Sequence, residues 1–200
     1  SEDDGPVDPT PTIGMVGLLE DADRQAMTLD FKNPGDLIYL LGPVRNEISS
    51  SEYVYKYHKV EYSPAPYANM KEEVDLVNAL LGVIDEGLVN SAHDVSEGGL
   101  AINLLESGFN RDLGFSILLD DEVRPDAFLF GEWGGRAVVT VSLKQQDAFE
   151  EAMEETGVQL LVLGEVTDGN IDVDDEVIGH ISEYKEAWNS GLEEKLFSKE

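Results

Sequence analysis

The sequence has no cysteine, few basic residues and no long apolar run, and each absence excludes a class of protein. Without cysteine there can be no disulfide, thiolate nucleophile or zinc–sulfur site. Only 13 Lys and Arg residues oppose 42 Asp and Glu residues, which gives a formal net charge of −29. Such a field repels nucleic acid and anionic membranes, so we expect neither as a partner. No apolar run is long enough to cross a bilayer and no signal peptide is visible, so we expect a cytoplasmic protein.

The 200 residues, of which 42% are apolar, can form one good core and predict a single folded domain. Residues 1–11, SEDDGPVDPTP, are acidic and rich in proline, as linkers often are. Because the sequence does not begin with methionine, we interpret residues 1–11 as a linker stump from a longer chain and 12–200 as the domain. We expect most acidic residues to be solvated surface, for which adaptation to high salt is one explanation.

Apolar periodicity predicts an alternation of strands and helices. Strands are expected at 12–19, 36–41, 114–119, 137–143 and 158–163. Helices are expected from Ser49, over 69–88, over 147–155 with Gly157 as the stop, and from Ile181 to the end. The alternation is irregular, with one βαβ-like unit, and it favours an α+β fold in which helices pack on a mixed β-sheet.

The long helix over 69–88 has the strongest pattern. Asn69 and Glu72 are spaced as a capping pair at its start. Its apolar residues recur every three or four positions along one face, which we expect to be buried: Met70, Val74, Val77, Leu81, Ile84 and Leu88. The closing helix has a similar stripe of Tyr184, Trp188, Leu192 and Leu196.

The stretch 91–107, SAHDVSEGGLAINLLES, passes from a polar segment into an amphipathic helix and contains the main candidate site. Asp94 and Glu97 are spaced as a capping box, which predicts a helix start. Gly98 and Gly99 then fall in the first turn, where each glycine costs about 1 kcal/mol of helix propensity relative to alanine. Either their amides approach an anionic ligand such as phosphate, or the glycines allow close packing on a neighbouring strand.

A second polar cluster is formed by Glu132 and Arg136, which bracket Trp133-Gly134-Gly135 at the start of a predicted strand. The arginine could bind a phosphate or carboxylate through two hydrogen bonds, or pair with a nearby acid. His93 and Asp94 could act as a base with its carboxylate, but adjacent side chains rarely face each other and no GxSxG motif is present.

The acidic segment Asp168, Asn170 and Asp172 has the spacing of a calcium loop. Val173 and Gly179 stand where that loop needs glycine and glutamate, so an exposed hairpin turn is the better interpretation. We therefore predict no metal site and assign no catalytic residue within this chain.

Several segments together resemble the phosphoribosylformylglycinamidine synthase II (PurL) family, part of the aminoimidazole ribonucleotide (AIR) synthase-related superfamily. They are PTPTIGMVGLLED, GDLIYLLG, SAHDVSEGGLAINLLESGF, FLFGEWGGRAVVTVS and LGEV, in the order of the family. HDVSEGGL is the most specific of them. The resemblance implies the fold of an AIR synthase-related C-terminal domain, the last of two copies in the full-length enzyme.

The resemblance implies an ATP-dependent ligase of purine biosynthesis that converts formylglycinamide ribonucleotide to the amidine, and a chain that is inactive alone. ATP and Mg²⁺ would bind in the full-length enzyme and not to this domain alone. Implied partners are the N-terminal ATP-binding domains of the same polypeptide, and a glutaminase with a small accessory subunit or a fused glutaminase domain.

The substrate-facing or cleft-facing residues that the resemblance carries over are His93, Asp94, Ser96, Glu97, Gly98, Gly99, Glu132 and Arg136. The family usually has Glu-Ser-Gln-x-Arg where this chain has Glu132-Trp133-Gly134-Gly135-Arg136, which fits a pseudo-site kept for structure. Two other functions stay open, namely a self-standing acidic module that binds an anion or a partner, and a superfamily member with kinase or selenophosphate-type chemistry.

Overall fold

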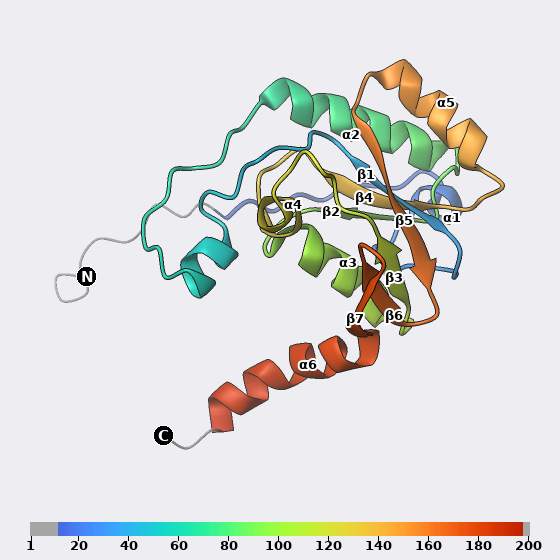
Figure 1. The fold of residues 1–200 in the computed structure, drawn as a ribbon. Helices are drawn as coiled ribbons and strands as arrows, with labels where there is room; N and C mark the ends of the chain where they lie inside the picture. The colour runs from blue at the N-terminus through green and yellow to red at the C-terminus, as the bar shows by residue number, and fades with distance from the viewer. Residues whose placement is uncertain (1–11, 198–200) are drawn as a thin grey trace.

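A seven-stranded mixed sheet with the order β2-β4-β1-β5-β3-β6-β7 forms the centre of the computed structural model (Figure 1). The structure describes residues 12–197, without the side chains of 23–24, 192–194 and 197, so the predicted linker at 1–11 lies outside the described residues. The strands are β1 (Leu37–Leu41), β2 (Ser91–Asp94), β3 (Gly114–Ile117), β4 (Ala137–Val141), β5 (Leu160–Thr167), β6 (Asn170–Val173) and β7 (Glu176–His180). The helices are α1 (Ala22–Gln25), the π-helical turn η1 (Tyr53–Tyr57), α2 (Met70–Asp85), α3 (Gly99–Phe109), α4 (Pro125–Phe130), α5 (Gln146–Thr156) and α6 (Ile181–Phe197).

The sheet combines antiparallel and parallel pairs, as the α+β prediction requires. β1 pairs antiparallel with both β4 and β5, so β4 and β5 run parallel to each other with β1 between them. The predicted βαβ-like unit is therefore the split arrangement β4-α5-β5. β3 and β6 form the parallel pair, and β7 closes one edge as an antiparallel hairpin with β6.

Helices cover both faces of the sheet. α2 and α5 pack on the face that receives Tyr39 and Leu41 of β1, while α3, α4 and α6 lie on the face that receives Ile38 and Leu40. These four β1 side chains are almost completely buried, which explains why the strand reads as a continuous apolar run.

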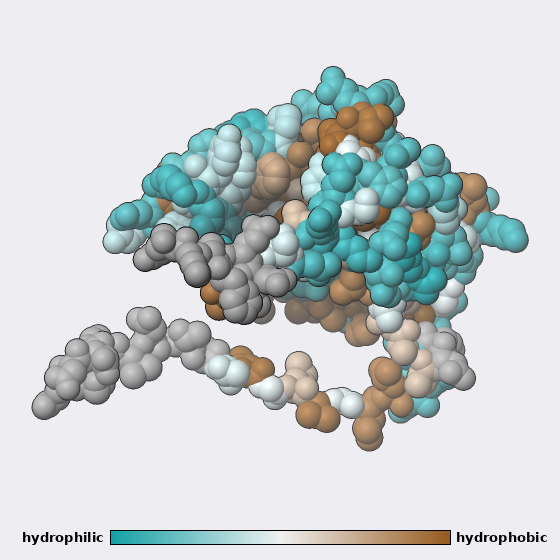
Figure 2. Space-filling view, turned by 90° about the horizontal axis from the view of Figure 1, so that it is seen from below, coloured by the Kyte–Doolittle hydropathy of each residue, from teal (hydrophilic) through white to brown (hydrophobic). Residues whose placement is uncertain are grey.

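The strand predicted at 12–19 does not form. These residues have no regular secondary structure and are exposed; the most exposed side chains are Val16 and Leu18 at 97% and 96%. Figure 2 shows the segment as an extended row with several apolar residues beside the body of the protein. A strand needs a neighbouring strand with which its backbone forms hydrogen bonds, and none pairs with 12–19 in the described part of the chain.

Helix α2 confirms the predicted cap and corrects the predicted buried face. The side chain of Asn69 accepts a hydrogen bond from the Lys71 amide and donates one to Glu72. The buried residues of the helix are instead Leu76, Ala79 and Val83. The stripe expected inside is mostly on the surface, since Met70, Val74, Val77 and Leu81 are 53–75% exposed.

The C-terminal elements also differ in part from expectation. In α6, Ile181 is fully buried, but Trp188 is about half exposed and lies against Phe109 of α3, at 5.8 Å between ring centroids. Residues 168–169 link β5 to β6 across the intervening β3, so the turn predicted there is no hairpin. The hairpin comes later, between β6 and β7, where Asp174 and Asp175 both have positive φ.

Candidate functional site

The polar stretch 91–98 forms β2 and a short turn that leads into α3. Asp94 ends β2 and its carbonyl accepts a hydrogen bond from Asn103 Nδ2 at 2.7 Å. The N-cap of α3 is Gly98, with φ of 81° and no side-chain cap. The predicted capping box of Asp94 and Glu97 is therefore wrong, because Asp94 is still in the sheet when the chain turns.

The two glycines meet conformational and packing requirements. Gly98 and Gly99 have φ values of 81° and 67°, in the left-handed region that glycine adopts without strain. A Cβ on Gly99 would lie 2.7 Å from the carbonyl oxygens of Leu129 and Gly131, so α3 can approach the end of α4 only with glycine here. A Cβ on Gly98 would instead meet the side chain of Ile102, at 2.3 Å. Close packing therefore accounts for Gly99, but against the end of helix α4 and not against a neighbouring strand as expected.

Glu132 joins three parts of the chain at this point. Its Oε1 atom accepts a hydrogen bond from the Gly98 amide at 2.9 Å and another from the Glu52 amide at 2.8 Å. The structure thus brings together the two segments that the sequence singled out, 93–99 and 132–136. It also adds the start of the helical turn expected from Ser49, a contact that sequence reasoning missed because no motif marks the Glu52 backbone.

Arg136 is buried behind this junction, which differs from the cleft-facing position expected for it. Its guanidinium is 3.6 Å from the centroid of the Trp133 ring, and its Nη2 donates to the Gly131 carbonyl at 2.7 Å. Burial, with a smaller effect of the Arg45 guanidinium, lowers the pKa of Arg136 to about 9. Trp133 is fully buried and serves the interior of the loop, whereas the next residue, Gly134, is exposed.

His93 is directed at α3 and away from Asp94. Its Nδ1 lies 3.2 Å from the Ser107 hydroxyl and its Nε2 lies 3.6 Å from a Glu106 carboxylate oxygen. In contrast, Asp94, Ser96 and Glu97 are exposed at the surface beside the glycines. If this site meets a ligand, these three side chains are the ones accessible to it, and their contact with substrate stays a prediction.

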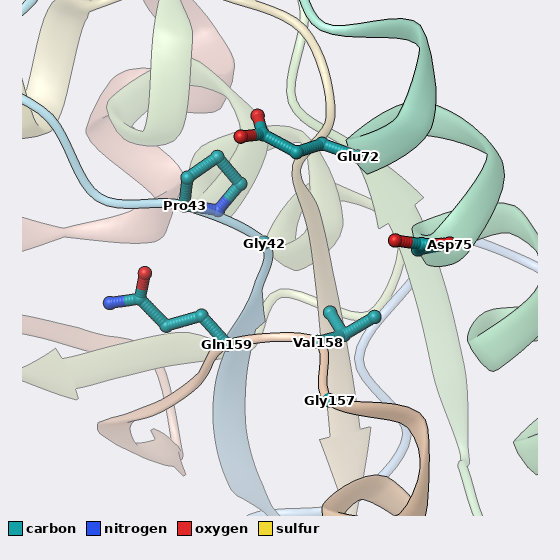
Figure 3. A pocket seen from close by; sticks show the side chains of 7 residues that line it. All are labelled: Gly42, Pro43, Glu72, Asp75, Gly157, Val158 and Gln159. Carbon is teal, nitrogen blue, oxygen red and sulfur yellow. The ribbon is translucent and has the colours of Figure 1, made fainter.

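A separate cavity of about 190 Å³ lies between the start of α2 and two turns of the chain (Figure 3). Glu72 and Asp75 of α2 line it together with the turns at 42–43 and 157–159. Arg45 Nη2 binds both oxygens of Glu72, at 2.7 and 2.8 Å, and Lys71 pairs with Asp75, so both carboxylates of the cavity have a basic partner. None of the predicted site residues lines this cavity. The sequence could not predict it, because its lining comes from three segments that are far apart in the chain.

The seven-stranded mixed sheet with helices on both faces is the fold of a known family of domains. Residues 33–176 match the family described as AIR synthase related protein, C-terminal domain, and the chain belongs to this family. Its relatives include phosphoribosylformylglycinamidine synthase subunit PurL of Carboxydothermus hydrogenoformans, 39% identical over 158 residues, and that of Alkaliphilus metalliredigens, 34% identical over 197 residues. These alignments cover 79% and 94% of this chain.

Solved structures agree with the family in fold. Thermotoga maritima PurL complexed with FGAR superimposes with a TM-score of 0.62 at 17% identity, covering 80% of this chain and 29% of that one. The chain spans only 22–26% of the length of the two relatives named above. No helix in the described residues is long and apolar enough to cross a membrane.

Proposed function

We propose that this chain is the C-terminal domain of an ATP-dependent ligase that converts formylglycinamide ribonucleotide (FGAR) to formylglycinamidine ribonucleotide in de novo purine biosynthesis. The observation that carries the proposal is the 39% identity to a PurL subunit over 158 residues. Structures of Thermotoga maritima PurL complexed with FGAR and with ATP support the same substrate and nucleotide.

The chemistry would divide between this domain and the rest of the polypeptide. ATP with Mg²⁺ phosphorylates the amide oxygen of FGAR, and ammonia then displaces phosphate to give the amidine. Among the described residues, no three carboxylate or histidine side chains are placed to hold a metal ion. The resemblance to the family places the ligands of ATP and Mg²⁺ mainly in the N-terminal domains, and this chain is expected to be inactive alone.

The part of this domain that serves the reaction is the surface around the start of α3. Asp94, Ser96 and Glu97 are exposed there. The buried Gly99 lets α3 pack on the end of α4, and Arg136 binds the Gly131 carbonyl beneath this surface. The buried Arg136 and Trp133 support the interpretation of the 132–136 loop as a pseudo-site that keeps a structural role. The proposed partners are the N-terminal ATP-binding domains of the same polypeptide and a glutaminase, with a small accessory subunit or fused, in the cytoplasm.

The proposal can be tested by replacing the matched segment of the Carboxydothermus hydrogenoformans PurL subunit with that of this chain. With ATP, Mg²⁺, ammonia and FGAR, the chimera should form the amidine, whereas the isolated 200-residue chain should not. The relative lacking the segment serves as the control. Turnover by the isolated chain, or a folded chimera that binds ATP and makes no amidine, would contradict the proposal.

A second candidate, an acidic module that binds a protein partner, is favoured by one observation. The exposed stripe of α2, formed by Met70, Val74, Val77 and Leu81, is unusual on a protein with a net charge of −29. A chimera without activity, together with an isolated chain that captures a defined partner through this stripe, would favour the module.

A further inference from the structure

Tyrosines are concentrated in one projecting segment, residues 52–67, which we name the tyrosine arm. Five of the seven tyrosines lie in it: Tyr53, Tyr55, Tyr57, Tyr62 and Tyr67. Tyr57 and Tyr62 are the most exposed, at 72% and 90%. Figure 1 shows the arm in blue-green, looping out from the body before the chain enters α2. Tyrosine is enriched at protein interfaces and at their energetic centres, so this concentration indicates a contact surface.

The base of the arm and its first tyrosines are fixed by contacts within the arm and with α4. At its base, the Ser50 hydroxyl lies 3.2 Å from the Ser63 carbonyl oxygen and 2.8 Å from the Pro64 carbonyl oxygen, and donates to these carbonyls. The Tyr53 ring stacks between Phe130 of α4 and Tyr57, with centroid distances of 4.6 and 5.2 Å. An arm ordered before binding loses little conformational entropy when a partner covers it.

The charge of the arm differs from that of the whole chain. Lys56 and Lys59 balance Glu52 and Glu61, so the arm is formally neutral on a protein with a net charge of −29. A protein surface that approaches the arm therefore meets less repulsion than it would over an average part of this acidic surface. The chemistry fits a weakly charged protein surface with apolar pockets for the rings.

The arm also lies directly beside the candidate site. Glu132 Oε1 binds the amide of Glu52, at the start of the arm, and the amide of Gly98, at the start of α3. A domain that closes over Asp94, Ser96 and Glu97 would thus reach the arm as well. The relatives provide ample chain for such a domain, since the match covers only 22% of one of them.

We propose that the tyrosine arm is the docking surface for the ATP-binding domain of the parent polypeptide, with the rings of Tyr57 and Tyr62 inserted as anchors. The choice of this occupant rests on the proposed function, because that domain is the one that must close over the candidate site. The arm would hold the two domains in register while the reaction takes place.

The direct test is a photo-crosslinking amino acid, p-benzoylphenylalanine, at position 62 of the full-length protein. The expected product is an internal cross-link to the ATP-binding domain, located by mass spectrometry. Position 143 is the matched control. Leu143 is also exposed, but it comes just after the end of β4 that is farther from the candidate site. A cross-link from position 62 to another subunit or another copy, no cross-link, or an equal yield from position 143 would overturn the proposal.

Substitutions give a second measurement. Tyr62→Ala should leave the melting temperature of the isolated chain unchanged, because the ring is almost fully exposed there. In the full-length protein it should reduce amidine formation by about tenfold or more, as expected for an interface anchor. Tyr57→Phe should retain activity, because it keeps the ring that is proposed to insert into the partner domain. Leu143→Ala should leave amidine formation unchanged. Unchanged turnover in Tyr62→Ala would refute the role of Tyr62 as an anchor. The cross-link tests the docking of the arm separately, even if the full-length protein proves to act on another substrate.

Discussion

Replacing Gly99 by alanine provides a sharp test of how the candidate site is built. The residue has a φ of 67°, and an added Cβ would lie 2.7 Å from two carbonyl oxygens of the α4 end, at Leu129 and Gly131. The left-handed conformation alone costs a residue with a Cβ about 1 kcal/mol, and forcing a methyl group into a packed site adds about 1–3 kcal/mol. We therefore expect Gly99→Ala to lower the free energy of unfolding by about 2–4 kcal/mol.

Gly157 offers a matched control for this experiment. Its φ of 70° is nearly the same, but nothing lies within 4 Å of the position of an added Cβ. Gly157→Ala should therefore cost only the conformational part, about 1 kcal/mol. Urea unfolding of the isolated chain, followed by circular dichroism, measures both variants, and their difference gives the packing part.

The same comparison decides between the two explanations of the glycine pair. If the glycines served only ligand contact, alanine would leave the isolated fold nearly untouched and damage only the full-length enzyme. The positive φ values and the Gly99 contacts now predict the opposite for the isolated chain. A Gly99→Ala variant no less stable than Gly157→Ala would refute the packing argument and return ligand contact as the explanation.

Two further predictions concern charge. Asp30 is largely buried, which by itself raises its pKa, but hydrogen bonds from Lys32 and Arg111 outweigh burial and lower the pKa from 3.8 to about 2. A pKa that is lower in the folded state stabilises the fold at a pH above the unfolded-state pKa, and this stability is lost as the pH falls through the folded-state pKa. Asp30→Asn should therefore lower the free energy of unfolding by about 2 kcal/mol at pH 7 and by little near pH 2. A cost that does not change between these pH values would contradict the linkage. Screening should relieve the self-repulsion of a net charge of −29, so the melting temperature should rise from low to moderate salt, and a flat or falling profile would contradict this.

The sequence alone determined the elements whose signals are local. The β1 run is continuous because both of its faces are buried, and α5 ends at Gly157 because the chain needs a left-handed residue there. The Asn69 cap depends on atoms within three residues of each other. The fold class, the family resemblance and the two polar clusters of the site followed from patterns of this kind, and the fold and the family are confirmed.

Only the tertiary structure decided which apolar faces are covered and how the site is assembled. Periodicity placed Val74 and Val77 on an apolar stripe of α2, but the sheet receives the adjacent stripe with Leu76 and Ala79. Burial depends on partners distant in the sequence, which local spacing cannot reveal. The same reason explains the exposed segment 12–19, the burial of Arg136 and the junction at Glu132, where Gly98 and Glu52, 46 residues apart by number, share one carboxylate oxygen.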